Sequence, residues 1–196
     1  MPLWIRFELD GREGFGTLEG DLIAVHAGAL FENPAPTGER APLAAVRLLA
    51  PCRPSKVIGL WNNFRALGQK IGAAVPEEPL YFLKAPSSIA DPEAAIRRPS
   101  SYAGKVVYEG ELGIVIGRTC RDAAEDEAER CILGYTCVND VTAIDILNRD
   151  PSFPQWTRAK SFDGFSPFGP AIATDLRPEE LWVRTILNGE ERQRYP

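Results

Sequence analysis

Histidine is almost absent from this chain. His26 is the only one among 196 residues, which excludes most histidine-centred chemistry, including a histidine-ligated zinc ion and a Ser-His-Asp triad. The four cysteines, Cys52, Cys120, Cys131 and Cys137, form neither a Cys-x-x-Cys pair nor a zinc-like spacing. We therefore expect them to be buried thiols.

Long apolar runs and blocks of basic residues are also missing. No window approaches 18 apolar residues, and the N-terminus lacks the charged-then-apolar layout of a signal peptide. The 27 acidic residues outnumber the 22 basic ones, for a net charge of -5 at pH 7. We expect no nucleic-acid surface and no membrane anchor, and a cytoplasmic location.

The composition itself is that of an ordinary globular protein. A hydrophobic fraction of 44% and a charged fraction of 25% argue against wholesale disorder. We expect a small β-rich unit over residues 1–50 and a larger domain over residues 51–196. In the first, the alternating runs Leu3 to Leu9 and Gly16 to Val25 are joined by glycine turns and followed by a stretch rich in proline and alanine, which together predict the β-rich unit.

The rest of the chain has mainly strand signals, with short helices and long loops. A helix is expected over residues 62–71, ended by Gly72, and another over 141–147, capped by Asn139 or Asp140. Loops are expected over 85–107 and 151–170. Strands are expected at 56–60 (buried), 80–84, 112–116, 132–138, 171–174 and 182–187, and further helical turns at 123–130 and 178–181. The predicted class is mixed but mainly β (α+β).

Two glutamates one residue apart dominate the candidate chemistry. Glu109 and Glu111 flank Gly110 in a β-like segment, so their side chains project to one face, roughly 7 Å apart. Asp140, in a turn after a second apolar stretch, can add a third carboxylate, and an all-oxygen set selects a hard cation such as Mg²⁺ or Mn²⁺. Spacing alone leaves an alternative open, in which both glutamates are the solvated face of an edge strand.

Four segments in this order resemble the fumarylacetoacetate hydrolase (FAH) family, which includes 2-hydroxyhepta-2,4-diene-1,7-dioate isomerases, acylpyruvate hydrolases and oxaloacetate decarboxylases. The similarity runs from about Lys56 to Gly189. The segments are YFLKAPSS at 81–88, YEGEL at 108–112, GYTCVNDVT at 134–142 and QWTRAKSFDGFSPFGP at 155–170.

The resemblance implies a fold, a metal and a set of site residues. The fold is an FAH-type β-roll, usually dimeric, so we expect a homodimer. Mg²⁺ or Mn²⁺ is implied at Glu109, Glu111 and Asp140, and a catalytic role at Lys160 and Asp163. The residues implied to line the cavity for a small oxo-acid substrate are Lys84, Ser87, Tyr108 and Phe165.

A 2-oxo acid or its enol offers two adjacent oxygens to one cation, which can stabilise the enolate formed when a C–H or C–C bond breaks. Isomerisation, decarboxylation and C–C hydrolysis all pass through such an enolate, so the acidic set alone does not choose among them. Lys160 could transfer a proton or act as a fixed cation for a substrate carboxylate.

Three departures from the family bear on the reaction. The His and Glu that activate water in its hydrolases have Arg65 and Gly68 nearest their positions, and neither can act as a base. Ile144 and Leu147 replace an Arg and a Gln that often contact substrate, which indicates a different or smaller substrate. The Asn188-Gly189 hairpin signal is followed by at most a stub of a returning strand, so we expect the sequence to be part of a longer polypeptide that carries the family's last strands.

The main hypothesis is a divalent-metal-dependent enzyme of the 2-hydroxyhepta-2,4-diene-1,7-dioate isomerase or decarboxylase type, working in the breakdown of aromatic compounds. One alternative is a C–C hydrolase of the fumarylacetoacetate or acylpyruvate type. The other is a non-catalytic homologue that binds a metal or a dicarboxylate.

Overall fold

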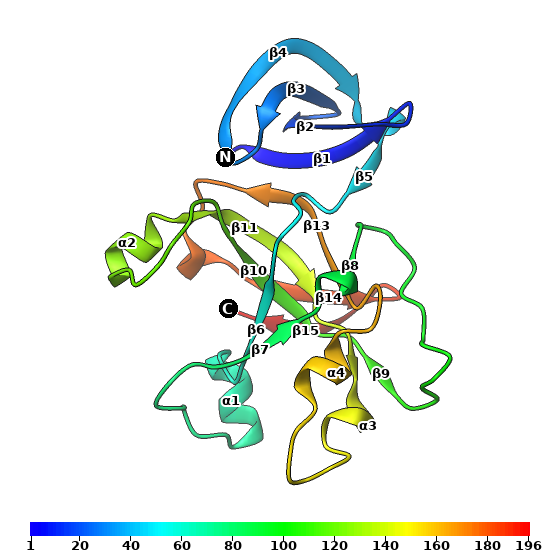
Figure 1. Ribbon diagram of the computed structural model, residues 1–196, viewed down its shortest axis with the longest axis vertical. Helices are drawn as coiled ribbons and strands as arrows, with labels where there is room; N and C mark the ends of the chain where they lie inside the picture. The colour runs from blue at the N-terminus through cyan, green and yellow to red at the C-terminus, as the bar shows by residue number, and fades with distance from the viewer.

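A computed structural model describes residues 1–196, and the chain is built mainly of strands (Figure 1). The strands are β1 (Leu3–Leu9), β2 (Arg12–Glu19), β3 (Leu22–Ala29), β4 (Glu32–Pro42), β5 (Arg47–Leu49), β6 (Val57–Trp61), β7 (Leu80–Lys84), β8 (Ile89–Ala90), β9 (Val106–Val107), β10 (Gly110–Ile116), β11 (Ile132–Asn139), β12 (Thr142–Ala143), β13 (Ser166–Ala173), β14 (Val183–Leu187) and β15 (Glu190–Tyr195). The helices are α1 (Arg65–Ile71), α2 (Glu125–Glu129), α3 (Ile144–Leu147) and α4 (Trp156–Lys160), with 3₁₀ turns at Leu43–Ala45, Pro86–Ser88 and Pro178–Glu180.

One large sheet runs through the molecule, in the order β10-β11-β13-β1-β2-β3-β4, with β5 paired to β1 and β8 paired to β13. The first four strands form a meander that meets the later strands where Leu3 pairs with Ala173 and Trp4 with Ile172. Figure 1 shows this meander at one end of the long axis, and the helices α1, α3 and α4 at the other. The mainly β class predicted from the sequence is confirmed.

The N-terminal strands form because their apolar residues alternate. Ile5 and Phe7 point inward from β1 and pack with Ile23 and Ala41 in a small core. Gly16 permits close approach of β2 to β3, because a Cβ there would lie 2.2 Å from the carbonyl oxygen of Ala24. The four buried residues of this core all lie within residues 1–50, and Ala171 of β13 packs against them. The division of the chain at residue 50 stays a prediction.

The proline-rich stretch is part of the β-rich N-terminal unit. It forms β4, an eleven-residue strand at the edge of the sheet. A proline lacks the N–H that a central strand must donate, but an edge strand has one side without a partner. The register shifts between Ala24 and His26 and between Ala27 and Ala29 accommodate the interruptions in pairing.

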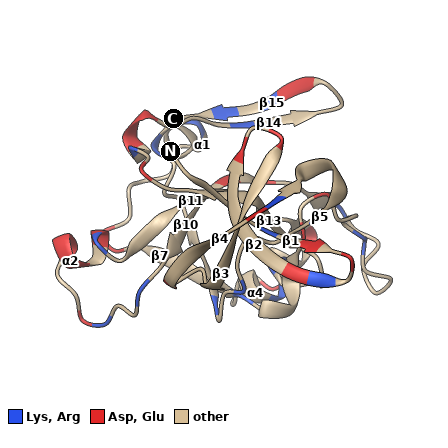
Figure 2. Ribbon diagram, turned by 90° about the horizontal axis from the view of Figure 1, so that it is seen from above, with Lys and Arg blue, Asp and Glu red and all other residues tan.

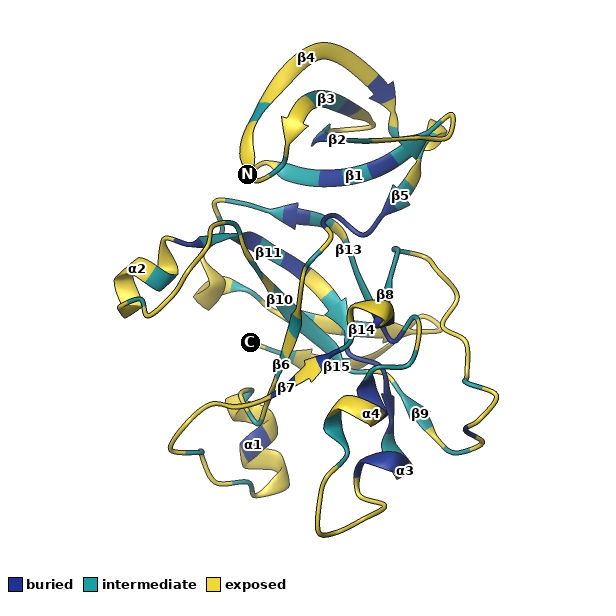
Figure 3. Cartoon of the chain, viewed as in Figure 1, coloured by how far each residue is buried: buried dark blue, intermediate teal, exposed yellow.

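A second core lies beneath the acidic residues. It contains Tyr102, Val141, Ala143, Ile146, Leu147, Ala159 and Phe165. Figure 3 shows this buried material concentrated in α3, α4 and the adjoining chain. The core explains why the expected loop at 151–170 instead contains α4 and the start of β13: Trp156 of α4 stacks on Phe82 of β7 with ring centroids 5.5 Å apart, so tertiary packing orders the segment.

Three further expectations about local structure were wrong. The α3 helix begins only after β12, so its N-cap is Ala143, which has no side chain that could cap it, and the Asp140 carboxylate pairs with two lysines. The β6 strand is not buried: Ile58 and Leu60 remain 53% and 43% exposed, because β6 pairs only with β7. Of the cysteines, Cys52 and Cys131 are buried, but Cys120 and Cys137 are exposed.

The Asn188-Gly189 turn has its returning strand, contrary to the expected stub. Both residues have positive φ, 53° and 82°, as a two-residue hairpin turn requires. The β15 strand pairs with β14 from Glu190 to Tyr195. The hairpin therefore satisfies its own inner backbone groups.

No helix is long and apolar enough to cross a membrane. Lysines and arginines are interspersed with aspartates and glutamates over the ribbon rather than gathered on one side (Figure 2).

The contribution of β13 to stability can be tested with two isoleucines of the large sheet. We expect Ile172→Ala to lower the free energy of unfolding by about 2–5 kcal/mol, because Ile172 is fully buried and its loss leaves a cavity. The matched change Ile114→Ala, at a side chain that is 54% exposed on β10, is expected to cost far less. Denaturant unfolding measures both, and equal losses would contradict this assignment of the core.

Candidate metal and active site

Strand register brings the three predicted carboxylates together. Glu109 immediately precedes β10, Glu111 is its second residue, and Asp140 directly follows β11. Gly110 pairs with Asn139, and the Asp140 N–H donates to the Glu109 carbonyl at 2.8 Å. Oxygens of all three carboxylates lie within 4.8 Å of one another. The pairing of β10 with β11 thus brings together acidic residues that are about thirty positions apart in the chain.

Lys160 enters this acidic cluster from the end of α4. Its side chain is 2% exposed, and Nζ lies 3.0 Å from Glu109 Oε2 and 2.6 Å from Asp140 Oδ2. Nζ also donates to the hydroxyl of Thr142 at 2.7 Å. The sequence therefore placed Lys160 correctly beside the acidic set, whereas its chemical role stays a prediction.

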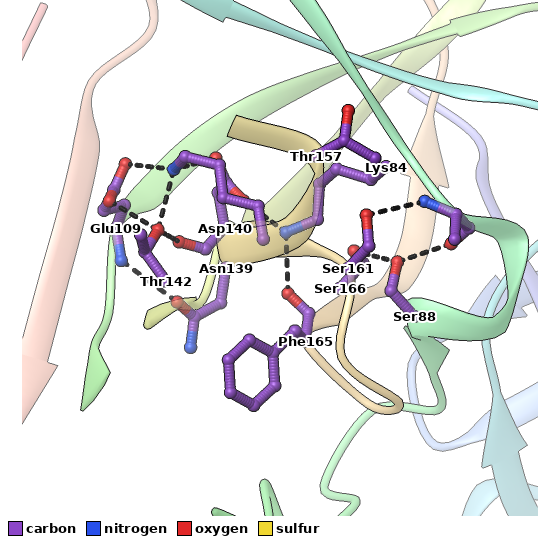
Figure 4. Close-up of polar contacts among 12 residues, drawn as sticks. Lys84, Ser88, Glu109, Asn139, Asp140, Thr142, Thr157, Ser161, Phe165 and Ser166 are labelled. Carbon is purple, nitrogen blue, oxygen red and sulfur yellow. Dashed lines mark hydrogen bonds and ion pairs between the residues drawn. The ribbon is translucent and has the colours of Figure 1, made fainter. Parts of the chain in front are cut away.

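Lys84 reaches the same cluster from the end of β7, on the other side of Asp140 (Figure 4). Its Nζ pairs with Asp140 Oδ1 and donates to the carbonyl oxygen of Phe165 at 2.9 Å. Burial lowers the pKa of Lys84, and the Asp140 carboxylate opposes that effect. Asp140 thus holds one lysine on each carboxylate oxygen.

Glu111 is the carboxylate without a lysine. Its pKa is raised to about 7, chiefly by burial and then by the negative charges of Asp140 and Glu109. Neither Lys84 nor Lys160 forms an ion pair with it. Three converging carboxylates, one of them lacking a counter-charge, fit a hard divalent cation, which prefers oxygen ligands.

Thr142 belongs to the cluster although sequence reasoning did not select it. Pairing of β12 with β9, Thr142 opposite Val107, sets its side chain near Glu109. The buried hydroxyl donates to Glu109 Oε1 at 2.7 Å while accepting from Lys160. Asn139 also helps, since its side-chain oxygen accepts from the Glu109 N–H at 3.1 Å. The signal was present in the motif NDVT, whose first, second and fourth residues all face this site.

The other predicted site residues are not gathered into the cluster. Ser87, Tyr108 and Asp163 are exposed, and none of their side chains makes a hydrogen bond or ion pair. The 3₁₀ turn at Pro86–Ser88 directs Ser88 inward instead, where its hydroxyl lies 2.7 Å from that of Ser166. Phe165 faces the core, so it reaches the cluster only through its carbonyl oxygen.

The two apolar replacements also serve the core. Leu147 is a buried member of the cluster formed by α3 and α4, and Ile144 packs against it. Both side chains therefore contribute to packing. The expectation that these positions alter substrate contacts stays a prediction.

A cleft of about 480 Å³ lies between β6, α1 and the segment that leads into β7. Arg65 and Gly68 line it, but none of the carboxylates or lysines of the cluster does. Trp61 in its wall packs against Trp156 of α4, with ring centroids 5.8 Å apart. The cleft is therefore linked through α4 to Lys160.

The fold and site are those of a mainly β protein that holds three carboxylates and two buried lysines at the edge of its large sheet. Residues 56–196 match the fumarylacetoacetate (FAA) hydrolase C-terminal family, and residues 3–51 match the family Rv2993c-like, N-terminal. The chain belongs to the fumarylacetoacetate hydrolase family, as its motifs predicted.

Relatives of the chain include enzymes and proteins without an assigned activity. Protein Rv2993c of Mycobacterium tuberculosis is 42% identical over 192 residues, which cover 91% of this chain and 70% of that protein. Oxaloacetate tautomerase YisK of Bacillus subtilis is 34% identical, covering 89% of this chain and 61% of that protein. The crystal structure of 5-carboxymethyl-2-hydroxymuconate delta-isomerase from Mycobacterium smegmatis has a TM-score of 0.87 and 42% identity, covering 99% of this chain and 75% of that one. The family contains isomerases, hydrolases and tautomerases.

The Thr142 hydroxyl can be tested by an isosteric change. We expect Thr142→Val to lower the free energy of unfolding of the metal-free protein by about 1–3 kcal/mol, because Lys160 and Glu109 each lose a buried hydrogen-bond partner. Thr142→Ser retains the hydroxyl and is expected to lose less. Urea unfolding of the three proteins measures the difference, and a stability order with Ser below Val would contradict the role of the hydroxyl.

Proposed function

We propose that this chain is a divalent-metal-dependent enzyme that acts on a 2-oxo acid or a 2-hydroxy-dienoic acid, with isomerase or decarboxylase chemistry. The observation that carries the proposal is the convergence of Glu109, Glu111 and Asp140 within 4.8 Å, with the Lys160 ammonium against two of them. The ion proposed is Mg²⁺ or Mn²⁺, since all three side chains offer oxygen.

Glu109, Glu111 and Asp140 would hold the cation, and Glu111 is the most available because no lysine occupies it. The chemistry that a bound dication supplies at such a site is Lewis-acid stabilisation of an enolate. Lys84 and Thr142 orient the carboxylates: Lys84 holds Asp140 from one side, and Thr142 holds Glu109 from the other.

Lys160 is the group best placed to move a proton. In isomerisation of a 2-hydroxy-2,4-dienoate, the 2-hydroxyl loses a proton and carbon 5 gains one, so the double bonds shift and no other bond breaks. A buried amine within hydrogen-bond distance of the acidic set can carry such a proton at Nζ. Asp163 is also proposed as catalytic from the family pattern, although its carboxylate is exposed and makes no ion pair in this structure.

Isomerisation is favoured over hydrolysis because neither residue nearest the positions of the family's water-activating pair can act as a base, although Glu77 and Glu78 also line the cleft. Gly68 is buried at the position nearest a family glutamate, and a Cβ there would lie 2.9 Å from Asn62 Oδ1. Arg65 cannot accept a proton at neutral pH. The isomerase and tautomerase names of relatives support the same direction.

Keto–enol tautomerisation of oxaloacetate is a second candidate, because the 34% identical relative from Bacillus subtilis carries that name. It requires the same proton redistribution on a smaller 2-oxo acid. The homodimer and the cytoplasmic location stay predictions, as does a role in the breakdown of aromatic compounds.

Removal of one carboxylate tests the metal. We expect Glu111→Gln to weaken Mn²⁺ binding by at least about 100-fold, because it removes one of three anionic ligands. Isothermal titration calorimetry on metal-free protein measures the dissociation constant. Glu39→Gln, at an exposed position on β4, is the matched control and is expected to bind as the unaltered protein does. Equal affinity in both variants would contradict the site.

The reaction is tested with a panel of enolised 2-oxo acids that includes oxaloacetate and 2-hydroxyhepta-2,4-diene-1,7-dioate. We expect metal-dependent loss of enol absorbance, with the carbon skeleton unchanged if the reaction is isomerisation and carbon dioxide released if it is decarboxylation. Lys160→Met is expected to lower kcat by about 10²–10⁴-fold. Exposed Lys56→Met is the control.

Product analysis of the same reactions separates the alternatives. Split products with solvent oxygen in the new carboxylate would favour the C–C hydrolase, and carbon dioxide would favour decarboxylation. Metal binding without turnover of any compound would favour the non-catalytic homologue over the proposed enzyme.

A further inference from the structure

The C-terminal hairpin touches the metal-site strand through one polar side chain. Strands β14 and β15 pair only with each other, while β10 is the outer strand of the large sheet. Gln193 of β15 bridges this gap: its Oε1 accepts from the Gly110 N–H at 3.0 Å, and its Nε2 donates to the Gly110 carbonyl at 2.6 Å. These are the only hydrogen bonds between the hairpin and the rest of the chain.

This double hydrogen bond lies on the residue between two of the three proposed metal ligands. Gly110 lies between Glu109 and Glu111. Its N–H is part of the peptide bond to Glu109, and its carbonyl is part of the peptide bond to Glu111. The primary amide of Gln193 therefore satisfies, on the open side of an edge strand, both groups that a neighbouring strand would otherwise bond. It fixes the two peptide planes from which both glutamates extend.

Gly110 and Thr185 are shaped for this contact. A Cβ at Gly110 would lie 2.0 Å from Thr185 Oγ1 and 3.2 Å from Gln193 Oε1, so only glycine permits the hairpin to approach. Thr185 in turn donates its hydroxyl to Gln193 Oε1 at 3.0 Å, which orients the amide. Three residues from three strands thus form one clamp.

We propose that Gln193 is a positioning residue of the metal site, which holds Glu109 and Glu111 at the separation that a divalent cation requires. This inference rests on the proposed function. Gln193 touches neither the carboxylates nor the lysines, so it acts through the backbone of Gly110. Removing such a partner of the ligand-bearing strand is expected to weaken metal affinity about 10–100-fold, as for other groups that orient metal ligands.

The purely structural alternative is that Gln193 only attaches the hairpin. Other contacts of the hairpin provide a control for this. Tyr195, the last residue of β15, packs its ring against Phe64, the residue before α1, with ring centroids 5.8 Å apart, and it takes no part in the hydrogen bonds to Gly110. Tyr195→Ala therefore weakens the attachment of the hairpin without removing the two hydrogen bonds of Gln193.

The experiment compares Gln193→Met, which keeps the side-chain length but cannot form the two hydrogen bonds, with Tyr195→Ala and the unaltered chain. Mn²⁺ dissociation constants are measured by calorimetry, thermal midpoints are measured without metal, and amide exchange at Gly110 is followed by NMR. We expect weaker Mn²⁺ binding by at least about 10-fold and faster exchange at Gly110 in Gln193→Met alone.

Unchanged Mn²⁺ affinity in Gln193→Met would overturn the inference while leaving the proposed metal site intact. Equal weakening in Tyr195→Ala would overturn it too, because the effect would then follow from attachment of the hairpin. Failure of the unaltered chain to bind Mn²⁺ would overturn the proposed site itself and the inference with it.

Discussion

The arrangement of the site depends on Asp140, a buried carboxylate that holds a lysine on each oxygen. Burying charge is costly unless each charge is paired and hydrogen-bonded. Lys84 and Lys160 meet that requirement from β7 and α4, elements far apart in the chain. The two lysines reach Asp140 only if β7, α4 and the end of β11 converge. The need to pair these buried charges therefore constrains how the three elements are placed.

Apolar packing holds β7 and α4 in the positions from which their lysines reach Asp140. The core formed by α3, α4 and Phe165 fixes the base of the Lys160 side chain, and the stack of Trp156 on Phe82 joins α4 to the strand that carries Lys84. Trp156 also packs against Trp61 in the wall of the cleft, so this pair of rings connects the cleft with the elements that carry both lysines.

Charge also explains how the site can bind a cation despite the lysines. Three carboxylates face two ammonium groups, and Glu111 is left without a partner. The surplus of negative charge lies beside Gly110, on the strand that the C-terminal hairpin holds. The proposed chemistry thus combines a fixed acidic side for metal with a fixed cationic side for proton transfer.

Residue types and local motifs determined a great deal of this protein. The EGE and NDVT motifs predicted the oxygen ligands, the scarcity of histidine removed whole classes of mechanism, and Gly72 and Asn188-Gly189 correctly marked a helix end and a hairpin turn. These features depend on chemistry or on backbone conformation within a few residues. Only the tertiary structure decided that Ser88 rather than Ser87 faces inward, that the proline-rich stretch forms β4 and that Gln193 reaches Gly110. The physical reason is that such contacts join strands distant in sequence, and burial in a shared core or sheet, not local preference, selects them.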